Sequence, residues 1–446
     1  MILHLRLRNH FGRFLLCSSL FVFNICQAQA DPAISDLHSL IDSKAKAIEN
    51  SVIEWRRHIH EHPELSNREF NTAKMVADHL KKLGLNVKTG VAHTGVVAVL
   101  KGGLPGPVVA LRADMDALPV VEETGLPYAS RVKSEYLGKE VGVMHACGHD
   151  THVAILMGVA SVLAEIRDQV PGGVKFIFQP AEEGAPAGEE GGARLMVEEK
   201  VLKNPDVNAV FGLHISQRQA AGQAGYRTRG AMASAQAYTI SIKGSQTHGA
   251  MPWAGVDPIV VGAQIVTALQ TIISRNIDIT KAPAVVTVGT FHAGVRSNII
   301  PETAELSGTI RTFDPADMKL IHQKVTDLAV GIGESMGAVV DVNIEPGYPV
   351  TFNNEELAHA MLPSLQRVFG FNQVQQMERI TGAEDFSFFQ EKVPGLYFYL
   401  GGRPPDIPEE KAVPNHSPRF YIDENALVYG VRAMSTLAVD YLTQHR

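Results

Sequence analysis

The sequence predicts an α/β fold, in which a domain built on a mostly parallel sheet carries a smaller inserted α+β domain of ferredoxin-like pattern. Two observations predict this architecture. Apolar, strand-like runs alternate with helical stretches in the outer parts of the chain, as they do where helices flank a parallel sheet. The middle of the chain instead follows a β-α-β-β-α-β order, which is the ferredoxin-like pattern.

The outer parts of the chain supply the elements of the larger domain. Residues 35–83 are expected to be helical, with Gly84 ending the second helix, because glycine commonly follows the last helical turn. A longer helix is expected at 151–167, after the strand at 108–112, because apolar residues recur there at helical spacing. In chain order, the expected elements are a strand at 108–112, this helix at 151–167, and strands at 174–179, 207–213 and 396–400.

The inserted domain begins with a strand at 235–243, where polar and apolar residues alternate as they do in a half-exposed strand. A helix at 258–275, strands at 284–289 and 303–311, a helix at 315–336 and a strand at 338–344 complete the pattern. We therefore divide the chain into a signal peptide (1–30), a larger domain in two parts (31–227 and 345–446) and an insertion (228–344).

The first 30 residues have the features of a secretory signal. Arg6, Arg8 and Arg13 precede an apolar run of about 12 residues, and Ala28-Gln29-Ala30 forms a cleavage site. We expect an exported, periplasmic or secreted protein without stable membrane insertion after cleavage, because no later segment reaches 18 unbroken apolar residues. An uncleaved membrane anchor is the alternative interpretation of this segment. Cleavage would remove Cys17 and Cys26, and would leave one cysteine in the mature chain.

Composition excludes several classes of protein. Of the 446 residues, 20% are charged and 45% hydrophobic, which is an ordinary globular mixture and excludes a disordered, collagen-like or coiled-coil chain. The formal net charge is −7, so no excess of basic residues indicates nucleic acid as a partner. Three cysteines are too few for a disulfide scaffold.

Acidic and imidazole side chains follow the expected strands. Asp114 and Asp116 come after the first of them, Glu182 and Glu183 after the second, and His214 after the third. Because ligands bind outside the carboxyl ends of strands in open α/β sheets, we expect these side chains to meet at one edge.

The segment before the long helix adds a thiol and three imidazoles within eight residues, 145–152. Cys147 and His149 are separated by Gly148, so in an extended segment their side chains point the same way. With Glu183 and His214 at the same edge, a divalent-metal site explains this pattern better than a buried free cysteine beside loop histidines. Adjacent carboxylates on a turn point in different directions, so Glu182 and Glu183 suit two roles, a general base and a ligand.

These motifs resemble the amidohydrolase branch of the aminoacylase/carboxypeptidase superfamily, which includes hippurate hydrolases and hydrolases of indole-3-acetyl–amino acid conjugates. The resemblance extends over nearly the whole mature chain. The matching segments are 60–65, 112–119, 147–150, 179–184, 212–214, 248–252, 297–301, 382–386 and 415–418.

The resemblance implies two divalent metal ions per subunit, bound by Cys147, His149, Glu183, His214 and His416. It implies Glu182 as the general base and Asp116 as a residue that holds a ligand imidazole in one tautomer. Asp114 stands where the wider superfamily has a ligand histidine, so it is either a weak ligand or none. His145 and His152 receive no role beyond support or exposure. Ligand type admits Zn, Mn, Co or Ni.

The expected insertion has one sheet face for its helices and a free edge, so we expect a homodimer formed by pairing through it. The resemblance also implies a substrate-binding role for the insertion. His248 would bind the substrate's carbonyl or carboxylate, in its own active site or in a partner's, and Asn298 and Arg296 are weaker candidates for holding the carboxylate. The implied activity is hydrolysis of small N-acyl-amino acids to a carboxylic acid and a free amino acid. The alternatives are a metallocarboxypeptidase or dipeptidase on the same core, a catalytically dead binding protein, and a hydrolase that uses Cys147 as nucleophile.

Overall fold

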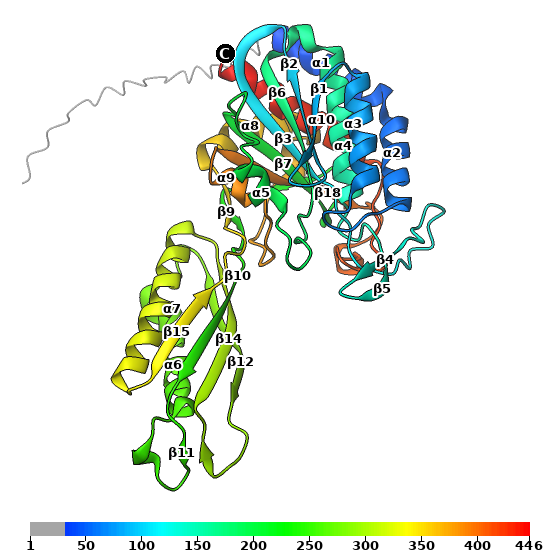
Figure 1. Cartoon of the computed structure of the whole chain (residues 1–446). Helices are drawn as coiled ribbons and strands as arrows, with labels where there is room; N and C mark the ends of the chain where they lie inside the picture. The colour runs from blue at the N-terminus through cyan, green and yellow to red at the C-terminus, as the bar shows by residue number, and fades with distance from the viewer. Residues whose placement is uncertain (1–31) are drawn as a thin grey trace, which may run out of the picture.

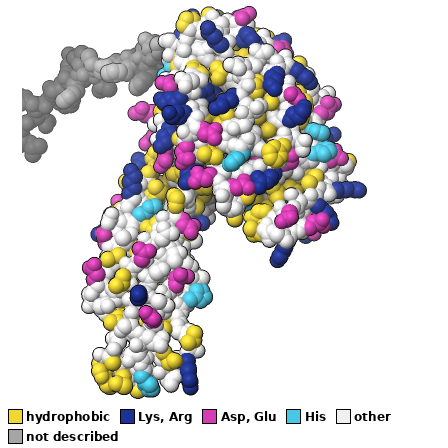
Figure 2. All heavy atoms as spheres, in the orientation of Figure 1, with side chains coloured by type: hydrophobic (Ala, Val, Ile, Leu, Met, Phe, Trp, Pro, Cys, Tyr) yellow, Lys and Arg dark blue, Asp and Glu magenta, His cyan; other side chains and the backbone are white. Residues whose placement is uncertain are grey.

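A computed structural model describes residues 32–446 (Figure 1). The expected signal peptide, residues 1–30, lies outside the described residues. A larger body holds a central sheet flanked by helices, and a narrower body extends from it (Figure 1). On the face seen in Figure 2, acidic and basic side chains are interspersed without a large area of one sign.

Three helices, rather than two, occupy the N-terminal region: α1 (Pro32–Ala47), α2 (Glu49–Glu61) and α3 (Phe70–Lys82). The expectation that Gly84 ends the second helix is therefore wrong, because Gly84 follows α3, in the left-handed conformation with φ 73°. The break between α2 and α3 has a local cause. Pro63 has no N–H to donate and disfavours helical geometry at His62 before it.

The large sheet has eight strands, and its centre is parallel. Strand β3 pairs in parallel with β6 and β7, and β18 in parallel with β7. These four strands are the ones expected in the larger domain. The antiparallel strands β1 and β2 and the short strands β8 and β17 were not predicted. In sheet order the strands are β1 (Asn86–Val91), β2 (Gly95–Lys101), β6 (Pro171–Gln179), β3 (Leu104–Asp114), β7 (Ala209–Ala220), β18 (Gly395–Arg403), β8 (Ala224–Tyr226) and β17 (Val374–Gln376).

Each face of this sheet forms its own hydrophobic core. Along β6, Phe176 and Phe178 belong to one core and Ile177 to the other, because side chains alternate between the faces of a strand. On the first face lie α1, α2, α3, α4 (His149–Glu165), α8 (Glu355–Phe369) and α10 (Ala426–Gln444), and on the second α5 (Gly192–Glu198) and α9 (Ser387–Gln390). The expected helix at 151–167 is α4, which begins two residues earlier.

The insertion has the expected β-α-β-β-α-β order. Its strands pair in the order β12-β14-β10-β15, each antiparallel to its neighbour, and α6 and α7 pack on the sheet. Asp257 and Asp314 cap the two helices by accepting hydrogen bonds from the first-turn N–H groups. The elements are β10 (Gln236–Lys243), α6 (Pro258–Asn276), β12 (Ala284–Ala293), β14 (Thr303–Thr312), α7 (Pro315–Ser335) and β15 (Val339–Ile344).

Short paired strands lie at both ends of the insertion. Strands β11 (Thr247–His248) and β13 (Ile299–Ile300) pair at the end remote from the large sheet (Figure 1). Strands β9 (Arg229–Met232) and β16 (Thr351–Asn353) pair near the junction of the two bodies, and β4 (Lys133–Tyr136) and β5 (Lys139–Gly142) form a separate hairpin. The domain boundaries at 228 and 344 stay a prediction.

Within the described residues, α6 is the one helix whose length and composition would suffice to cross a membrane. Its Val261, Ile265, Leu269 and Ile272 are buried in the core beneath the four-stranded sheet. These apolar residues therefore pack within the inserted domain.

Candidate dimetal active site

The candidate site lies where strands of the large sheet end. Asp114 is the last residue of β3, and Glu182 and Glu183 follow the last residue of β6. His214 lies inside β7 rather than after it, because β7 continues to Ala220 while paired with β18. The convergence expected from parallel topology is thus present, with β7 extending further along the cavity than expected.

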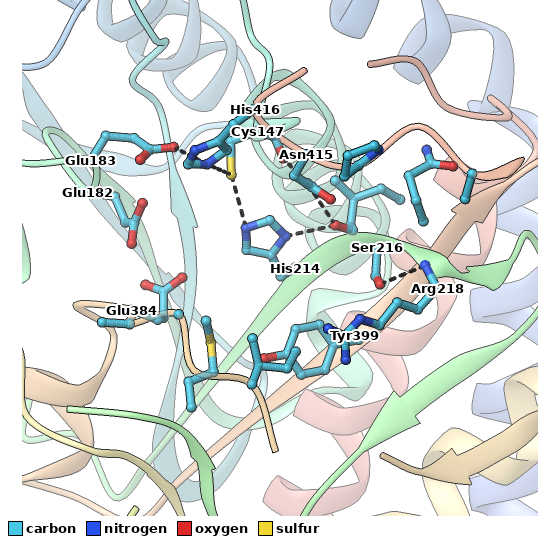
Figure 3. A pocket seen from close by; sticks show the side chains of 18 of the residues that line it. Cys147, Glu182, Glu183, His214, Ser216, Arg218, Glu384, Tyr399, Asn415 and His416 are labelled. Carbon is cyan, nitrogen blue, oxygen red and sulfur yellow. Dashed lines mark hydrogen bonds and ion pairs between the residues drawn. The ribbon is translucent and has the colours of Figure 1, made fainter. Parts of the chain in front are cut away.

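Cys147 is the centre of the site. Its Sγ lies 3.4 Å from Nε2 of His214 and 3.3 Å from Nε2 of His416, and His416 Nε2 is 3.2 Å from a carboxylate oxygen of Glu183 (Figure 3). Two groups of potential ligands share its thiol: Cys147, His149 and His214 form one, and Cys147, Glu183 and His416 the other. In each group the ligand atoms lie within 4.8 Å of one another.

The protein fixes two of these imidazoles in the tautomer that a metal ligand needs. Nδ1 of His149 donates to the backbone oxygen of Asp116 (2.9 Å), and Nδ1 of His214 donates to the backbone oxygen of Ile215 (2.8 Å). Each Nε2 then presents its lone pair. Nε2 of His149 is buried without a hydrogen-bond partner among the described residues. A thiol, three imidazoles and a carboxylate therefore fit two divalent ions with a shared sulfur ligand.

His416 reaches Cys147 across 269 positions of the sequence. The backbone N–H of His416 donates to the oxygen of Ala146 at 2.8 Å, and the side chain of Asn415 donates to the oxygen of Cys147 at 2.8 Å. His416 itself has a positive φ of 68°. These bonds fasten the Pro-rich loop to the segment that carries the thiol.

Asp116 holds the two glutamates as well as an imidazole. Its carboxylate accepts hydrogen bonds from the backbone N–H groups of Glu182 (3.1 Å) and Glu183 (3.0 Å), and from the hydroxyl of Ser66 (2.7 Å). The shorter contact to His149 comes from the backbone oxygen of Asp116, whereas its carboxylate lies 3.4 Å from Nδ1. The carboxylate therefore mainly fixes the Glu182-Glu183 turn.

Asp114 is fully buried, and both of its oxygens have partners. One accepts from Arg112 at 2.6 Å and the other from Nδ1 of His152 at 2.5 Å, while Nε2 of His152 accepts the backbone N–H of Ile215 at 2.9 Å. His152 thus connects β3 to β7 behind the ligands, a position that the sequence did not reveal. His145 is also buried, and its ring nitrogens have no partner among the described residues.

Glu182 lies beside the ligand groups and is 6% exposed. Its Oε2 is 3.8 Å from Nε2 of His149, and its carboxylate clusters with those of Asp114 and Glu384. Burial, followed by the charges of Glu384 and Glu183, raises the pKa of Glu182 well above its usual range. A carboxylate with a raised pKa is suited to accept and return a proton near neutral pH.

Burial also shapes the charge state of the ligands. It lowers the pKa of His214 to about 3, which keeps this imidazole neutral and able to bind a metal. It raises the pKa of the Cys147 thiol, as does the charge of Glu183. A divalent cation acts in the opposite direction, because a metal-bound thiol is deprotonated outright.

Four of the predicted ligands, Cys147, Glu183, His214 and His416, line a cavity of about 620 Å³, a volume within the usual range for small-molecule sites. Sequence reasoning gave no role to several lining residues, because their neighbours in the chain show no recognisable pattern. Glu384 stood in a matching segment but without a role. Arg218 lies beyond the expected end of the strand at 207–213, and Tyr399 lies on a strand for which no ligand was expected. The lining also includes Ser216, Gln217, Met232, Tyr348, Ile380, Glu409 and Asn415.

The structure does not bring the insertion's predicted residues to this cavity. His248, Arg296 and Asn298 are exposed, and none of them lines it. His248 belongs to β11, at the remote end of the insertion (Figure 1). Within one chain, these residues are therefore separate from the ligand cluster.

Comparison with known proteins agrees with this geometry. The model of "Peptidase family M20/M25/M40" matches residues 110–440. The chain is 42% identical to thermostable carboxypeptidase 1 of Saccharolobus solfataricus (91% of this chain, 99% of the relative) and 38% identical to N-acetylcysteine deacetylase of Bacillus subtilis (88% and 97%).

A crystal structure of a dinuclear metal-binding peptidase of the M20 family from Bacillus subtilis superposes with a TM-score of 0.71. It is 34% identical and covers 89% of this chain and 99% of its own. Fold, ligand groups and sequence therefore agree, and the chain is a metal-dependent hydrolase that belongs to peptidase family M20/M25/M40.

Proposed function

We propose that this protein hydrolyses the amide bond of N-acyl-amino acids, releasing a carboxylic acid and a free amino acid. The observation that carries the proposal is the pair of ligand groups sharing Cys147, with the buried carboxylate of Glu182 beside them. A water nucleophile, its base and an adjacent cavity of about 620 Å³ are what hydrolysis of a small amide requires.

The chain's residues divide the reaction between them. When bound, the two divalent ions supply Lewis acidity toward the attacking water and the amide carbonyl. Glu182 accepts a proton from the water while the water oxygen bonds to the carbonyl carbon. Glu182 then returns this proton to the leaving nitrogen as the carbon–nitrogen bond breaks. Asp116 keeps Glu182 and Glu183 in place through their backbone N–H groups during both steps.

His248, Arg296 and Asn298 are proposed to act on the substrate from a partner subunit. All three are exposed and remote from the cavity of their own chain. In this proposal His248 stabilises the oxyanion, while Arg296 or Asn298 holds the carboxylate of the amino acid.

A second candidate function is that of a carboxypeptidase or dipeptidase. It is favoured by the 42% identity to a thermostable carboxypeptidase over 91% of this chain. The same ligands and base would serve both activities, because both break an amide next to a carboxylate. A catalytically dead binding protein is disfavoured by the presence of Glu182 beside the ligand groups.

A substrate panel on metal-loaded protein tests the proposal. It compares benzoyl-, acetyl-, indoleacetyl- and succinyl-amino acids with dipeptides of the same C-terminal residue. The expected result is a higher kcat/KM for at least one acyl class than for every dipeptide. Faster cleavage of dipeptides throughout would favour the peptidase, and binding without turnover of any compound would favour the dead binding protein.

We further propose that the protein is exported to the periplasm or secreted, from the signal-like sequence of residues 1–30. N-terminal sequencing of the protein expressed from the full chain is expected to begin at Asp31. Recovery of the intact N-terminus in a membrane fraction would instead support an uncleaved anchor.

A further inference from the structure

Arg218 lies on the cavity wall, and no ion-pair partner for it occurs among the described residues. It lies on β7 with His214 and Ser216, in the stretch after Ser216 where the pairing of β7 with β18 becomes irregular. All three line the cavity (Figure 3). Among the described residues, Arg218 forms hydrogen bonds only through its backbone, with Ser216 Oγ (3.2 Å) and with Arg403. Its guanidinium is thus free to bind a ligand.

Tyr399 adds a buried donor at the same wall. It lies on β18 opposite His214 in the parallel register, and it is 4% exposed. Its hydroxyl has no hydrogen-bond partner among the described residues, which is costly for a buried polar atom. Burial raises the pKa of Tyr399, so the phenol keeps its proton and remains a donor. Arg218 is near enough to act on this hydroxyl electrostatically.

Arg218 has the opposite charge to the carboxylates around the cavity. Apart from the candidate ligands His214 and His416, Arg218 is the one basic side chain on the described lining, which also carries the carboxylates of Glu182, Glu183, Glu384 and Glu409. The guanidinium of Arg218 attracts an anionic ligand group to the wall where Arg218 and Tyr399 lie. Along the strand, Arg218 is about 13 Å from His214 measured between backbones, so its long side chain can meet the far end of a small substrate.

We propose that Arg218, with the hydroxyls of Tyr399 and Ser216, forms a subsite that binds a carboxylate of the substrate. This proposal rests on the proposed function and names a substrate class for it: N-acyl-amino acids with a carboxylate directed at β7. A planar guanidinium binds a carboxylate through two parallel hydrogen bonds, and a tyrosine hydroxyl can add a third. The carboxylate belongs either to the end of a dicarboxylic acyl group or to the amino acid, and in the second case Arg218 takes the role proposed above for Arg296 or Asn298.

Three matched compounds separate these two sources. N-succinyl-alanine and N-butyryl-alanine have acyl chains of equal length, and only the succinyl chain ends in a carboxylate. N-butyryl-alanine and N-butyryl-alaninamide differ only at the amino-acid carboxylate. We would measure kcat/KM for all three with wild type, Arg218→Gln and Tyr399→Phe. Arg419→Gln serves as control, because Arg419 is an exposed arginine in the His416 loop that does not line the cavity.

Wild type is expected to prefer the compound carrying the recognised carboxylate. Arg218→Gln should lower that preference by about tenfold or more, the usual loss for hydrogen bonds to a charged group. Tyr399→Phe should lower it in the same direction by less, and Arg419→Gln should leave it unchanged. Loss of the succinyl-over-butyryl preference assigns the acyl end, and loss of the acid-over-amide preference assigns the amino-acid end.

A binding measurement keeps this test independent of turnover. Calorimetric titration of the same three compounds into metal-loaded Glu182→Gln, with and without Arg218→Gln, should show the same change in the ratios of Kd. If no N-acyl-amino acid is hydrolysed by wild type, the proposed function fails while the Kd ratios still test the subsite. Ratios unchanged by Arg218→Gln, or an equal loss for all three compounds, would overturn the subsite.

Discussion

At the scale of single residues, backbone groups control the chemistry of the site. The backbone oxygens of Asp116 and Ile215 accept hydrogen bonds from Nδ1 of His149 and His214, which leaves each Nε2 for the candidate ligand groups. The backbone N–H groups of Glu182 and Glu183 donate to one carboxylate, that of Asp116. Because these bonds involve the main chain, ligand geometry depends on the path of the backbone as well as on which side chains are present.

Replacing each of the two adjacent glutamates by glutamine is predicted to have a different effect, on the chemical step in one case and on metal content in the other. Glu182→Gln should retain its metal and bind substrate, while the chemical step slows by roughly two to four orders of magnitude, the usual contribution of a positioned base. Glu183→Gln should lose metal, because an amide oxygen is a poorer ligand than a carboxylate. Metal analysis and single-turnover rates on both variants check this.

Each glutamate variant is the matched control for the other, since both replace one carboxylate on the same turn. Excess metal should partly restore Glu183→Gln and should not restore Glu182→Gln. A metal-free Glu182→Gln beside a loaded but inert Glu183→Gln would reverse the assignment.

The thiol of Cys147 is predicted to be essential for metal binding, because both ligand groups share it. Cys147→Ser should lose most of its metal at neutral pH, since a hydroxyl is not deprotonated as a thiol is. Metal content by elemental analysis measures this, with circular dichroism to confirm the fold. In wild type, chelation should abolish hydrolysis, and Mn, Zn or Co should restore part of it. Wild-type metal content and rate in Cys147→Ser would make the thiol structural only.

At the scale of elements, the start of α4 is held by Gly148. It has φ 91°, and a Cβ built there would lie 2.4 Å from a side-chain carbon of Ile215 and 3.2 Å from the ring of Phe420. The tight junction sets the directions of Cys147 before it and His149 after it.

Gly148→Ala is therefore predicted to lower both stability and metal affinity. We expect about 1–2 kcal/mol from the left-handed backbone and about 1–3 kcal/mol from overpacking. Gly138→Ala is the matched control, because Gly138 has φ 74° but open space around its Cβ position, and it should show the backbone cost alone with full metal content. Chemical unfolding and metal titration measure the two effects. Equal losses of stability in both variants would show that the close contacts around Gly148 do not contribute to stability or metal affinity.

At the scale of the whole molecule, the inserted domain has two free sheet edges, β12 and β15. Unpaired edges favour association with a second copy, and isologous pairing through this domain would satisfy one of them. We predict a homodimer by sedimentation equilibrium at micromolar concentrations. A monomer across this range would reject the dimer and leave His248 without a partner's active site.

Dimerisation predicts that inactive chains complement each other. A His248→Ala chain keeps Glu182, and a Glu182→Gln chain keeps His248, so a mixed dimer contains one complete site if His248 acts across the interface. Co-refolding equal amounts should recover about a quarter of the wild-type sites with random pairing. Each variant refolded alone is the control. If mixed dimers form without recovering activity, His248 acts in the active site of its own chain or takes no part in the reaction.

The sequence by itself determined the elements whose signal is local. The strands β3 and β6 are apolar runs with acidic residues at or soon after their ends, and the parallel topology places those ends together whatever the distant packing. The insertion was predictable because alternation and helical spacing are visible within each segment. The Cys147–His149 spacing and the paired glutamates of the turn likewise indicated metal chemistry from neighbouring residues alone.

Only the tertiary structure decided what depends on distant contacts. The short outer strands β8 and β17 exist through pairing and carry little pattern of their own. His416 meets Cys147 through hydrogen bonds across 269 positions, and motif resemblance was needed to anticipate it. Arg218 and Tyr399 line one cavity because β7 continues beyond His214 alongside β18. Periodicity describes one segment at a time, whereas a cavity is formed by segments that contact each other only after folding.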